Sequence, residues 1–237
     1  MMAHMKRKLA ESYLAGVISG DGSMQKYFIQ IDGDNKEWLS FINGLFQLLF
    51  GKRGKITRRG KKCFRLYINS REIVKFFNEE WCIPLGKKSH SVRPPRERLT
   101  ENAMRVYYAI GWLDSEGTVE DWKKGNHSYK RIQFKTKSRE VRDFLFEILQ
   151  ENDIEACRYE DKEGSFRIQI AKESSIRTFG EKLNFFHPKK RARLLKGSTP
   201  PEARLKLKGI GGGAQQGVKP AVQLDSTPGN SPGATAG

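Results

Sequence analysis

Two acidic residues, Asp21 and Glu116, each end an apolar segment of the same form. The first segment reads LAGVISGDG at 14–22, and the second reads AIGWLDSEG at 109–117. Both have helical spacing, which places each acid at a helix C-terminus, where the negative end of the helix dipole points. Two carboxylates at such ends repel each other unless cations lie there. Oxygen ligands of this kind are typical of a Mg²⁺ site, which can support metal-assisted hydrolysis of a phosphodiester.

A stripe of small residues is expected to bring the two helices together. Gly16 and Gly20 are four positions apart, and so are Gly111 and Ser115, so each helix offers a face that another backbone can approach closely. Packing on these interface residues places the carbonyls of Gly20 and Ser115 beside the two acids, as further oxygen ligands. The alternative is that the acids are only solvated cap residues, which would explain each acid alone but not their matched positions.

The elements around the two segments occur twice in the same order. After the first segment come a strand, MQKYFIQID, a helix, NKEWLSFINGLFQLLF, a hairpin, GKRGKITRRGKKCFRLYIN, and a helix, REIVKFFNEEW. The second half has RIQFK, SREVRDFLFEILQEN, a hairpin that ends in FRIQI, and SSIRTFGEKL, and its extra residues, EDWKKGNHSY, are expected to form a longer turn. This order predicts an α+β chain of two αββαββα repeats.

The paired segments and the elements behind them resemble the LAGLIDADG homing endonucleases in their single-chain, two-motif form, over about residues 9–195. The sequence departs from the motif at Ser19, Ala109 and Trp112. The resemblance implies a pseudo-twofold arrangement, with motif helices packed at the interface and antiparallel sheets that form a DNA-binding saddle. The implied domains are an N-terminal extension at 1–8, a first half at 9–86, a linker at 87–102 and a second half at 103–208.

The resemblance also implies a chemistry, in which a monomer makes a double-strand break in a long, non-palindromic DNA target, with one strand cut per carboxylate. Asp21 and Glu116 would share about two or three Mg²⁺ ions, which Mn²⁺ or Ca²⁺ can replace in binding. The family places a polar residue on the strand after each motif, and alignment assigns this role to Asp32 and Lys135. Asp32 departs from the usual Gln or Lys, so a metal ligand, a water-orienting group and a surface residue all stay open for it. For Lys135 the alternative is a solvated strand lysine.

The net charge of +17 and a pI near 9.8 favour a polyanionic partner. Strand alternation predicts one outward face in each half that could read base edges and neutralise phosphates. The predicted DNA contacts are Lys26, Gln30, Arg53, Lys55, Thr57, Arg58, Arg59, Lys61, Arg65, Tyr67, Asn69, Tyr129, Arg131, Gln133, Arg167 and Gln169. The basic linker residues, which are Lys87, Lys88, Arg93, Arg96 and Arg98, are expected to contact the DNA backbone or to be solvated. The first hairpin tip, RGKITRRGKK, is more basic than the second, CRYEDKEGSF, and should contribute more of the salt-dependent affinity.

Two other functions fit the same pattern. The first is an RNA maturase that assists intron splicing on this fold. The second is a DNA-binding regulator that has lost cleavage. Retention of both acids argues against the regulator, because a pure binder has no use for clustered carboxylates that face a polyanion.

The remaining features concern the cellular location of the protein, disorder at its C-terminal end and the burial of its cysteines. No apolar run is long enough to span a bilayer and no signal peptide precedes the first helix, which favours the cytoplasm or an organelle that holds the host genome, with no membrane partner. Residues 209–237 contain eight Gly and three Pro and no aromatic residue, which predicts disorder. Cys63, Cys82 and Cys157 form no CxxC pair, and we expect them to be small core or half-buried residues.

Overall fold

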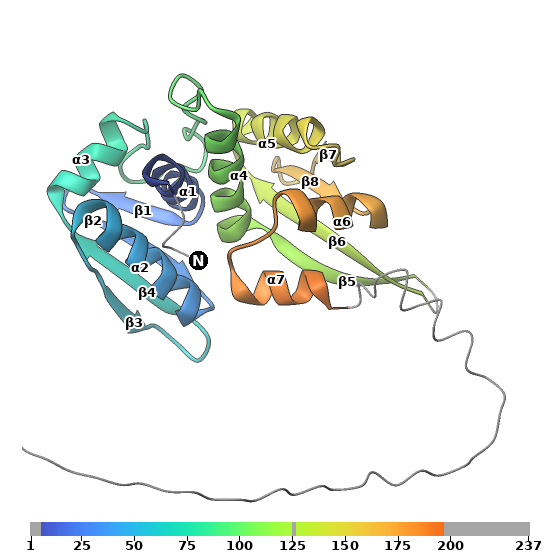
Figure 1. The fold of residues 1–237 in the computed structure, drawn as a ribbon, viewed down its shortest axis with the longest axis horizontal. Helices are drawn as coiled ribbons and strands as arrows, with labels where there is room; N and C mark the ends of the chain where they lie inside the picture. Colours follow the sequence, from blue (N-terminus) through green and yellow to red (C-terminus); the bar gives the residue numbers. More distant parts are fainter. Residues whose placement is uncertain (1–5, 125–126, 197–237) are drawn as a thin grey trace, which may run out of the picture. The chain divides into compact units, whose positions relative to one another are not determined.

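The computed structural model describes residues 6–124 and 127–196, apart from the side chains of 123–128. Over these residues the chain forms seven helices and two four-stranded antiparallel sheets, which confirms the α+β prediction (Figure 1). No helix among them is both long and apolar enough to cross a membrane. The predicted tail at 209–237 lies outside the described residues, as does most of the 1–8 extension.

The two halves have the same order of elements and the same sheet topology. In the first half the sheet order is β1-β2-β4-β3, and in the second it is β5-β6-β8-β7. The elements of the first half are α1 (Arg7–Gly20), β1 (Gly22–Gln25), β2 (Phe28–Gly33), α2 (Lys36–Phe50), β3 (Lys55–Arg58), β4 (Phe64–Asn69) and α3 (Arg71–Glu79). Those of the second half are α4 (Asn102–Glu116), β5 (Thr118–Lys124), β6 (His127–Thr136), α5 (Arg139–Glu151), β7 (Cys157–Glu160), β8 (Phe166–Ile170), α6 (Glu173–Lys182) and α7 (Pro188–Leu195).

Three parts of the sequence prediction need correction. The expected strand MQKYFIQID is a hairpin, because the chain turns at Lys26 and Tyr27. Most of the expected turn EDWKKGNHSY instead lies in strands β5 and β6, where Trp122 is opposite Tyr129 and aromatic cross-strand pairing supports the ribbon. Helix α7 was not predicted, because Leu194 is its one buried residue and gives no helical periodicity.

The alternation that predicts the strands also determines which side of each sheet is buried. On β2, Ile29 and Ile31 are buried, and they lie opposite Ile68 and Leu66 of β4. The intervening residues point to the other side of the sheet. Because the helices cover the buried side, each half keeps one open sheet face.

The three cysteines are exposed, which corrects the prediction that they are core or half-buried residues. Cys63 lies in the loop before β4, Cys82 follows α3 with a positive φ of 52°, and Cys157 begins β7, a strand whose four residues are all exposed. Their positions in loops and an edge strand override the general tendency of free cysteine to be buried.

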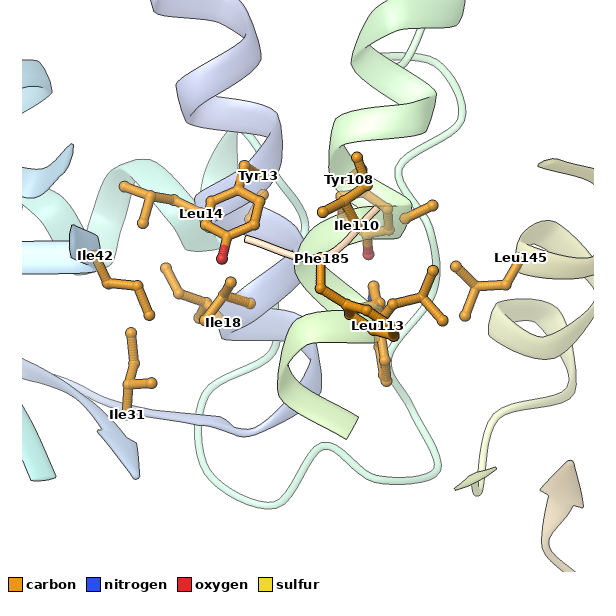
Figure 2. Close-up of a cluster of buried hydrophobic side chains, with 14 of the residues drawn as sticks. Tyr13, Leu14, Ile18, Ile31, Ile42, Tyr108, Ile110, Leu113, Leu145 and Phe185 are labelled. Atoms are coloured by element: carbon orange, nitrogen blue, oxygen red, sulfur yellow. The ribbon is translucent and has the colours of Figure 1, made fainter. Parts of the chain in front are cut away.

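Helices α1 and α4 meet through their backbones. Leu14 and Ile18 of α1 extend away from α4, toward Ile42 of the first half (Figure 2). A Cβ atom on Gly16 would lie 2.1 Å from the carbonyl oxygen of Tyr108, and one on Gly111 would lie 2.2 Å from the carbonyl oxygen of Tyr13. The predicted stripe of small residues therefore forms the contact between the halves.

Gly16→Ala should destabilise the protein strongly, because the new methyl group would collide with backbone atoms that have no rotamer to escape into. We expect a loss of about 3 kcal/mol or more, which lowers the melting temperature by roughly 6–12 °C for a chain of this size. Gly180→Ala is the matched control, since a Cβ there in α6 would meet Leu194 at an ordinary 3.5 Å. It should change stability by less than about 1 kcal/mol, in the stabilising direction. Equal melting temperatures for the two variants would contradict a backbone contact at Gly16.

Candidate active site

The two acidic residues meet at the C-terminal ends of α1 and α4. Asp21 caps α1, and Glu116 is the last residue of α4. A Cβ atom on Gly20 would lie 2.1 Å from Ser115 Oγ and 3.3 Å from Glu116 Cγ, so the helix ends are in direct contact. Burial raises the pKa of both carboxyl groups, and the charge of Asp21 raises the pKa of Glu116 further. The structure thus brings both predicted acids to one place.

Two lysines, the buried Lys88 and the half-buried Lys190, accompany the acids, and sequence reasoning missed their role. The ammonium group of Lys88 donates to the carbonyls of Ser19, at 2.9 Å, and of Gly20 at the end of α1. The ammonium group of Lys190, from α7, donates to the last carbonyls of α4, including that of Ser115 at 3.3 Å. Each lysine therefore places a positive charge on the negative end of one motif helix.

Burial makes both ammonium groups stronger acids, because it disfavours their charged form. It lowers the pKa of Lys88 to about 8 and that of Lys190 to about 8, against the opposing effect of nearby carboxylates. Glu116 is among those carboxylates for both lysines, and so is Asp21. The site thus contains two acids and two bases in mutual electrostatic contact.

A repeat in the sequence could have revealed the lysines. The doublet in GKKS at 86–89 precedes the doublet in PKKR at 188–191 by the same interval that separates FRLYI from FRIQI. The sequence predicts that Lys88 contacts the DNA backbone or is solvated. The structure corrects the solvated alternative, because the residue is only 8% exposed, and the DNA contact stays a prediction. The predicted metal-ligand role of the Gly20 and Ser115 carbonyls stays a prediction, and each of these carbonyls accepts a lysine hydrogen bond.

Two cavities open beside the helix ends, and each is lined by both halves. The first cavity, of about 330 Å³, lies between the end of α4 with Lys190 and strand β2 with Asp32. The second cavity, of about 250 Å³, lies between the end of α1 with Lys88 and strand β6 with Lys135. Glu116 lines both cavities. Neither half alone contains a complete cavity.

Asp32 and Lys135 occupy corresponding places, as the alignment predicts, but with different partners. Asp32 accepts two hydrogen bonds from the guanidinium group of Arg65, each 2.7 Å long. Lys135 forms ion pairs with Asp161 at 3.2 Å and Glu163 at 2.7 Å. The first cavity thus receives a carboxylate from its strand, and the second receives an ammonium group.

The strand register places most of the predicted DNA contacts on the two open sheet faces. Gln30, Tyr67 and Lys55 form one row across the first sheet. The corresponding row of the second sheet includes Gln133 and Gln169, whose side chains hydrogen-bond at 2.7 Å. Members of the same faces are Thr57, Arg65, Asn69, Tyr129, Arg131 and Arg167, and the exposed Lys26, Arg53, Arg59 and Lys61 lie in adjoining turns and loops.

Arg58 does not belong to this set, which corrects the prediction. It lies opposite Phe64, and Phe64 packs against the core, so the Arg58 side chain leaves β3 on the helix side. Its guanidinium group donates to the carbonyls of Gly60 and Lys61, at 2.9 Å each. Its role is therefore to stabilise the hairpin turn.

The two open faces differ in how their basic residues are paired. On the second face Arg131 pairs with Glu120 at 2.7 Å, and Arg167 pairs with Asp161 at 2.8 Å. On the first face, no acid within the described part of the chain forms an ion pair with Lys55, Arg59 or Lys61. The first face therefore keeps more positive charge available for an anionic partner.

The donor set at the helix ends fits a hard divalent cation. Among the side chains that the structure describes, no group of three His, Cys, Asp or Glu is placed so that it could hold a metal ion. Asp21 and Glu116 instead supply two carboxylates at adjoining helix ends, where the negative charge of Asp21 disfavours ionisation of Glu116. A divalent cation would relieve that repulsion, and water or phosphate would complete its oxygen ligands.

Comparison with known proteins identifies the repeats. The family model described as LAGLIDADG-like domain matches residues 9–82 and 104–184. The homing endonuclease I-ApeI of Aeropyrum pernix is 29% identical over 221 residues, which are 89% of this chain and 97% of that protein. Among solved structures, I-DmoI in complex with DNA and Mn has a TM-score of 0.55 at 16% identity, over 75% of this chain and 97% of the other.

The fold also occurs in a protein that is not named as a homing endonuclease. Full-length DUF199/WhiA from Thermatoga maritima has a TM-score of 0.55 at 14% identity, over 86% of this chain and 66% of the other. The structural likenesses therefore establish the fold and leave the activity to the site. Both repeats match the family model in register with the two motif helices, and on that evidence the chain belongs to the LAGLIDADG family.

Proposed function

We propose that this protein is a site-specific homing endonuclease that makes a double-strand break in a long, non-palindromic DNA duplex. The observation that carries the proposal is the pair of cavities at the meeting point of the motif helices. Glu116 lines both cavities, and each cavity also has a lysine bound to the end of one motif helix. The two open sheet faces offer Arg, Lys and Gln side chains suited to phosphates and base edges.

Each residue at the helix ends has a separate proposed role in cleavage. Asp21 and Glu116 would hold the divalent cation, which supplies activation of water and stabilisation of the leaving oxygen when it is bound. Lys88 and Lys190 fix the helix ends and offset the charge of a phosphate beside them. Lys135 contributes a positive charge to the second cavity. Asp32, paired with Arg65, gives the first cavity a further carboxylate that can orient water.

The related proteins support this proposal. I-ApeI is named a homing endonuclease, and structures of I-DmoI include complexes with DNA and Mn or Ca. The second repeat, present in the same chain, supports a monomer acting on unequal half-sites, because the two open faces carry different side chains.

The proposal is tested by selecting cleaved duplexes from a randomised DNA library in Mg²⁺. We expect one long, non-palindromic site to be enriched and cut on both strands, and EDTA to prevent cutting. Ca²⁺ should permit binding of the selected duplex. Splicing of an intron RNA without cleavage of any library duplex would instead support the maturase, and sequence-specific binding without a break would support a regulator.

The first open face should dominate the salt dependence of DNA binding. Alanine at Lys55, Arg59 and Lys61 together should flatten the slope of log affinity against log salt by up to about three units, because each lost phosphate contact releases one counterion fewer. Alanine at Lys75, Lys162 and Arg177 removes the same net charge from exposed positions elsewhere and should change the slope by less than about one unit. Fluorescence anisotropy with the selected duplex at several salt concentrations measures both. Equal slope changes in the two triple variants would contradict the asymmetry.

A further inference from the structure

The carboxylate of Asp114 is buried in a hydrogen-bond network that joins both halves. Its side chain is 1% exposed. Oδ2 accepts a hydrogen bond from Tyr13 Oη at 2.8 Å and one from the backbone N–H of Phe186 at 3.1 Å, and Oδ1 accepts one from the N–H of His187 at 3.1 Å. Trp38 Nε1 donates to Tyr13 Oη at 2.9 Å. These bonds offset the cost of burying the acid and fix its position.

The residues held by Asp114 lead directly into α7. His187 is the N-cap of that helix, and Lys190 lies within its first turn. The ammonium group of Lys190 then returns to the backbone carbonyls of Leu113 and Asp114. The side chain of Asp114 therefore binds the backbone at the start of α7, and the backbone carbonyl of Asp114 accepts a hydrogen bond from Lys190, one turn further along that helix. Lys190 has little freedom to leave the first cavity while both contacts hold.

The first half holds its lysine by other means. Ser19 stands at the position equivalent to Asp114, and among the described residues its hydroxyl group makes no hydrogen bond to the segment that carries Lys88. That segment is instead tied to β1, where the N–H of Gly86 donates to the carbonyl of Met24 at 2.8 Å. A defect at Asp114 should therefore affect one cavity and spare the other.

We infer that Asp114 is a positioning residue of the first cavity, which acts on cleavage of one DNA strand through Lys190. This inference rests on the proposed endonuclease function. A carboxylate that only stabilised the fold would affect the two cavities alike, since it lies at the contact between the halves. A carboxylate that positions Lys190 predicts a difference between the two strands and no further effect once the lysine is removed.

The test uses the full chain and the library-selected duplex, labelled on each strand, in single-turnover cleavage with Mg²⁺. Asp114→Ser, which gives the second half the residue of the first, should slow one strand at least tenfold more than the other. Lys190→Met should slow the same strand, and the double variant should be no more than about twofold slower than Lys190→Met alone. Ser175→Ala, which removes the hydrogen bond that the N–H of Glu155 donates to the buried Ser175 hydroxyl group, is the stability control and should leave the strand ratio unchanged.

Hydrogen exchange gives a readout that does not depend on cleavage. The amides of Phe186 and His187 should exchange faster in Asp114→Ser, while those of residues 86–92 keep their wild-type rates. Tyr13→Phe removes one donor to Asp114 and leaves the backbone bonds, so it should give a smaller shift of the same strand if Asp114→Ser fails to fold.

Three results would overturn the inference. They are equal slowing of both strands by Asp114→Ser or Tyr13→Phe, slowing of the strand that Lys190→Met spares, and fully additive losses in the double variant. Failure of the proposed function has a separate signature, because the wild-type chain would then cut no library duplex. In that case unchanged exchange at Phe186 and His187 would still reject the positioning role.

Discussion

Asp21→Asn and Glu116→Gln should each abolish double-strand cleavage and leave specific DNA binding within about tenfold. Each substitution removes a charged oxygen ligand at the meeting point of the helix ends, and it also removes a negative charge that repels phosphate. We expect the cleavage rate to fall by a factor on the order of 10³, which corresponds to about 4 kcal/mol of transition-state stabilisation. Gel analysis of the selected duplex in Mg²⁺ measures cleavage, and anisotropy in Ca²⁺ measures binding.

The matched control for the acids is Glu72→Gln, a carboxylate-to-amide change at an exposed position of α3. It should leave both cleavage and binding at wild-type values. Cleavage that survives in Asp21→Asn and Glu116→Gln, with binding lost instead, would show that the two acids maintain the structure and do not hold a cation.

Lys88→Met and Lys190→Met should each slow cleavage by about a hundredfold, mainly on one strand. The methionine keeps much of the buried stem, but the carbonyls at one helix end lose a charged donor and the cavity loses its positive charge. Strand-resolved single-turnover rates measure the effect. Lys87→Met is the control, since Lys87 is the exposed neighbour of Lys88 and should keep the wild-type rates. Equal loss in Lys87→Met and Lys88→Met would assign the effect to general DNA attraction.

The pH dependence of cleavage provides a second check on the lysines. Because the pKa of each is lowered to about 8, both ammonium groups are charged below that pH and lose their charge as the pH rises through it. The acids, whose pKa is raised, become charged as the pH rises at the acidic end. The cleavage rate should be highest between the pH at which the acids become charged and the pH at which the lysines lose their charge. The decline near pH 8 should disappear in the variant that combines Lys88→Met and Lys190→Met. A wild-type rate that keeps rising well above pH 8 would contradict a role for the charged form.

The motif pair and the strand alternation were sufficient to predict the two repeats, the interface glycines and the location of the acids. Gly16 and Gly111 leave a signal because close backbone contact demands small residues at fixed spacing. Lys88 and Lys190 leave almost no signal in the sequence, because their hydrogen-bond partners are backbone carbonyls, which every residue has. The doublet repeat was visible, but only the structure shows that the second lysine of each doublet reaches a helix end.

The other errors have local physical causes. Arg58 was predicted to contact DNA because it lies in the basic hairpin tip, but alternation from Thr57 places it on the helix side of β3, and its contacts with the turn hold it there. The β5–β6 extension depends on cross-strand pairing of Trp122 with Tyr129, which is absent from any window along one strand. Helix α7 depends on what its first turn contacts, above all Asp114, which lies far away in sequence.

The first cavity draws one of its walls from residues 187–193, which are made late in synthesis. A ribosome that adds roughly 5–20 residues per second needs several seconds to travel from Glu116 to Lys190. Both carboxylates therefore exist well before the lysine that covers the end of α4. A chain interrupted between Ser165 and His187 would contain every residue that lines the second cavity and would lack one wall of the first.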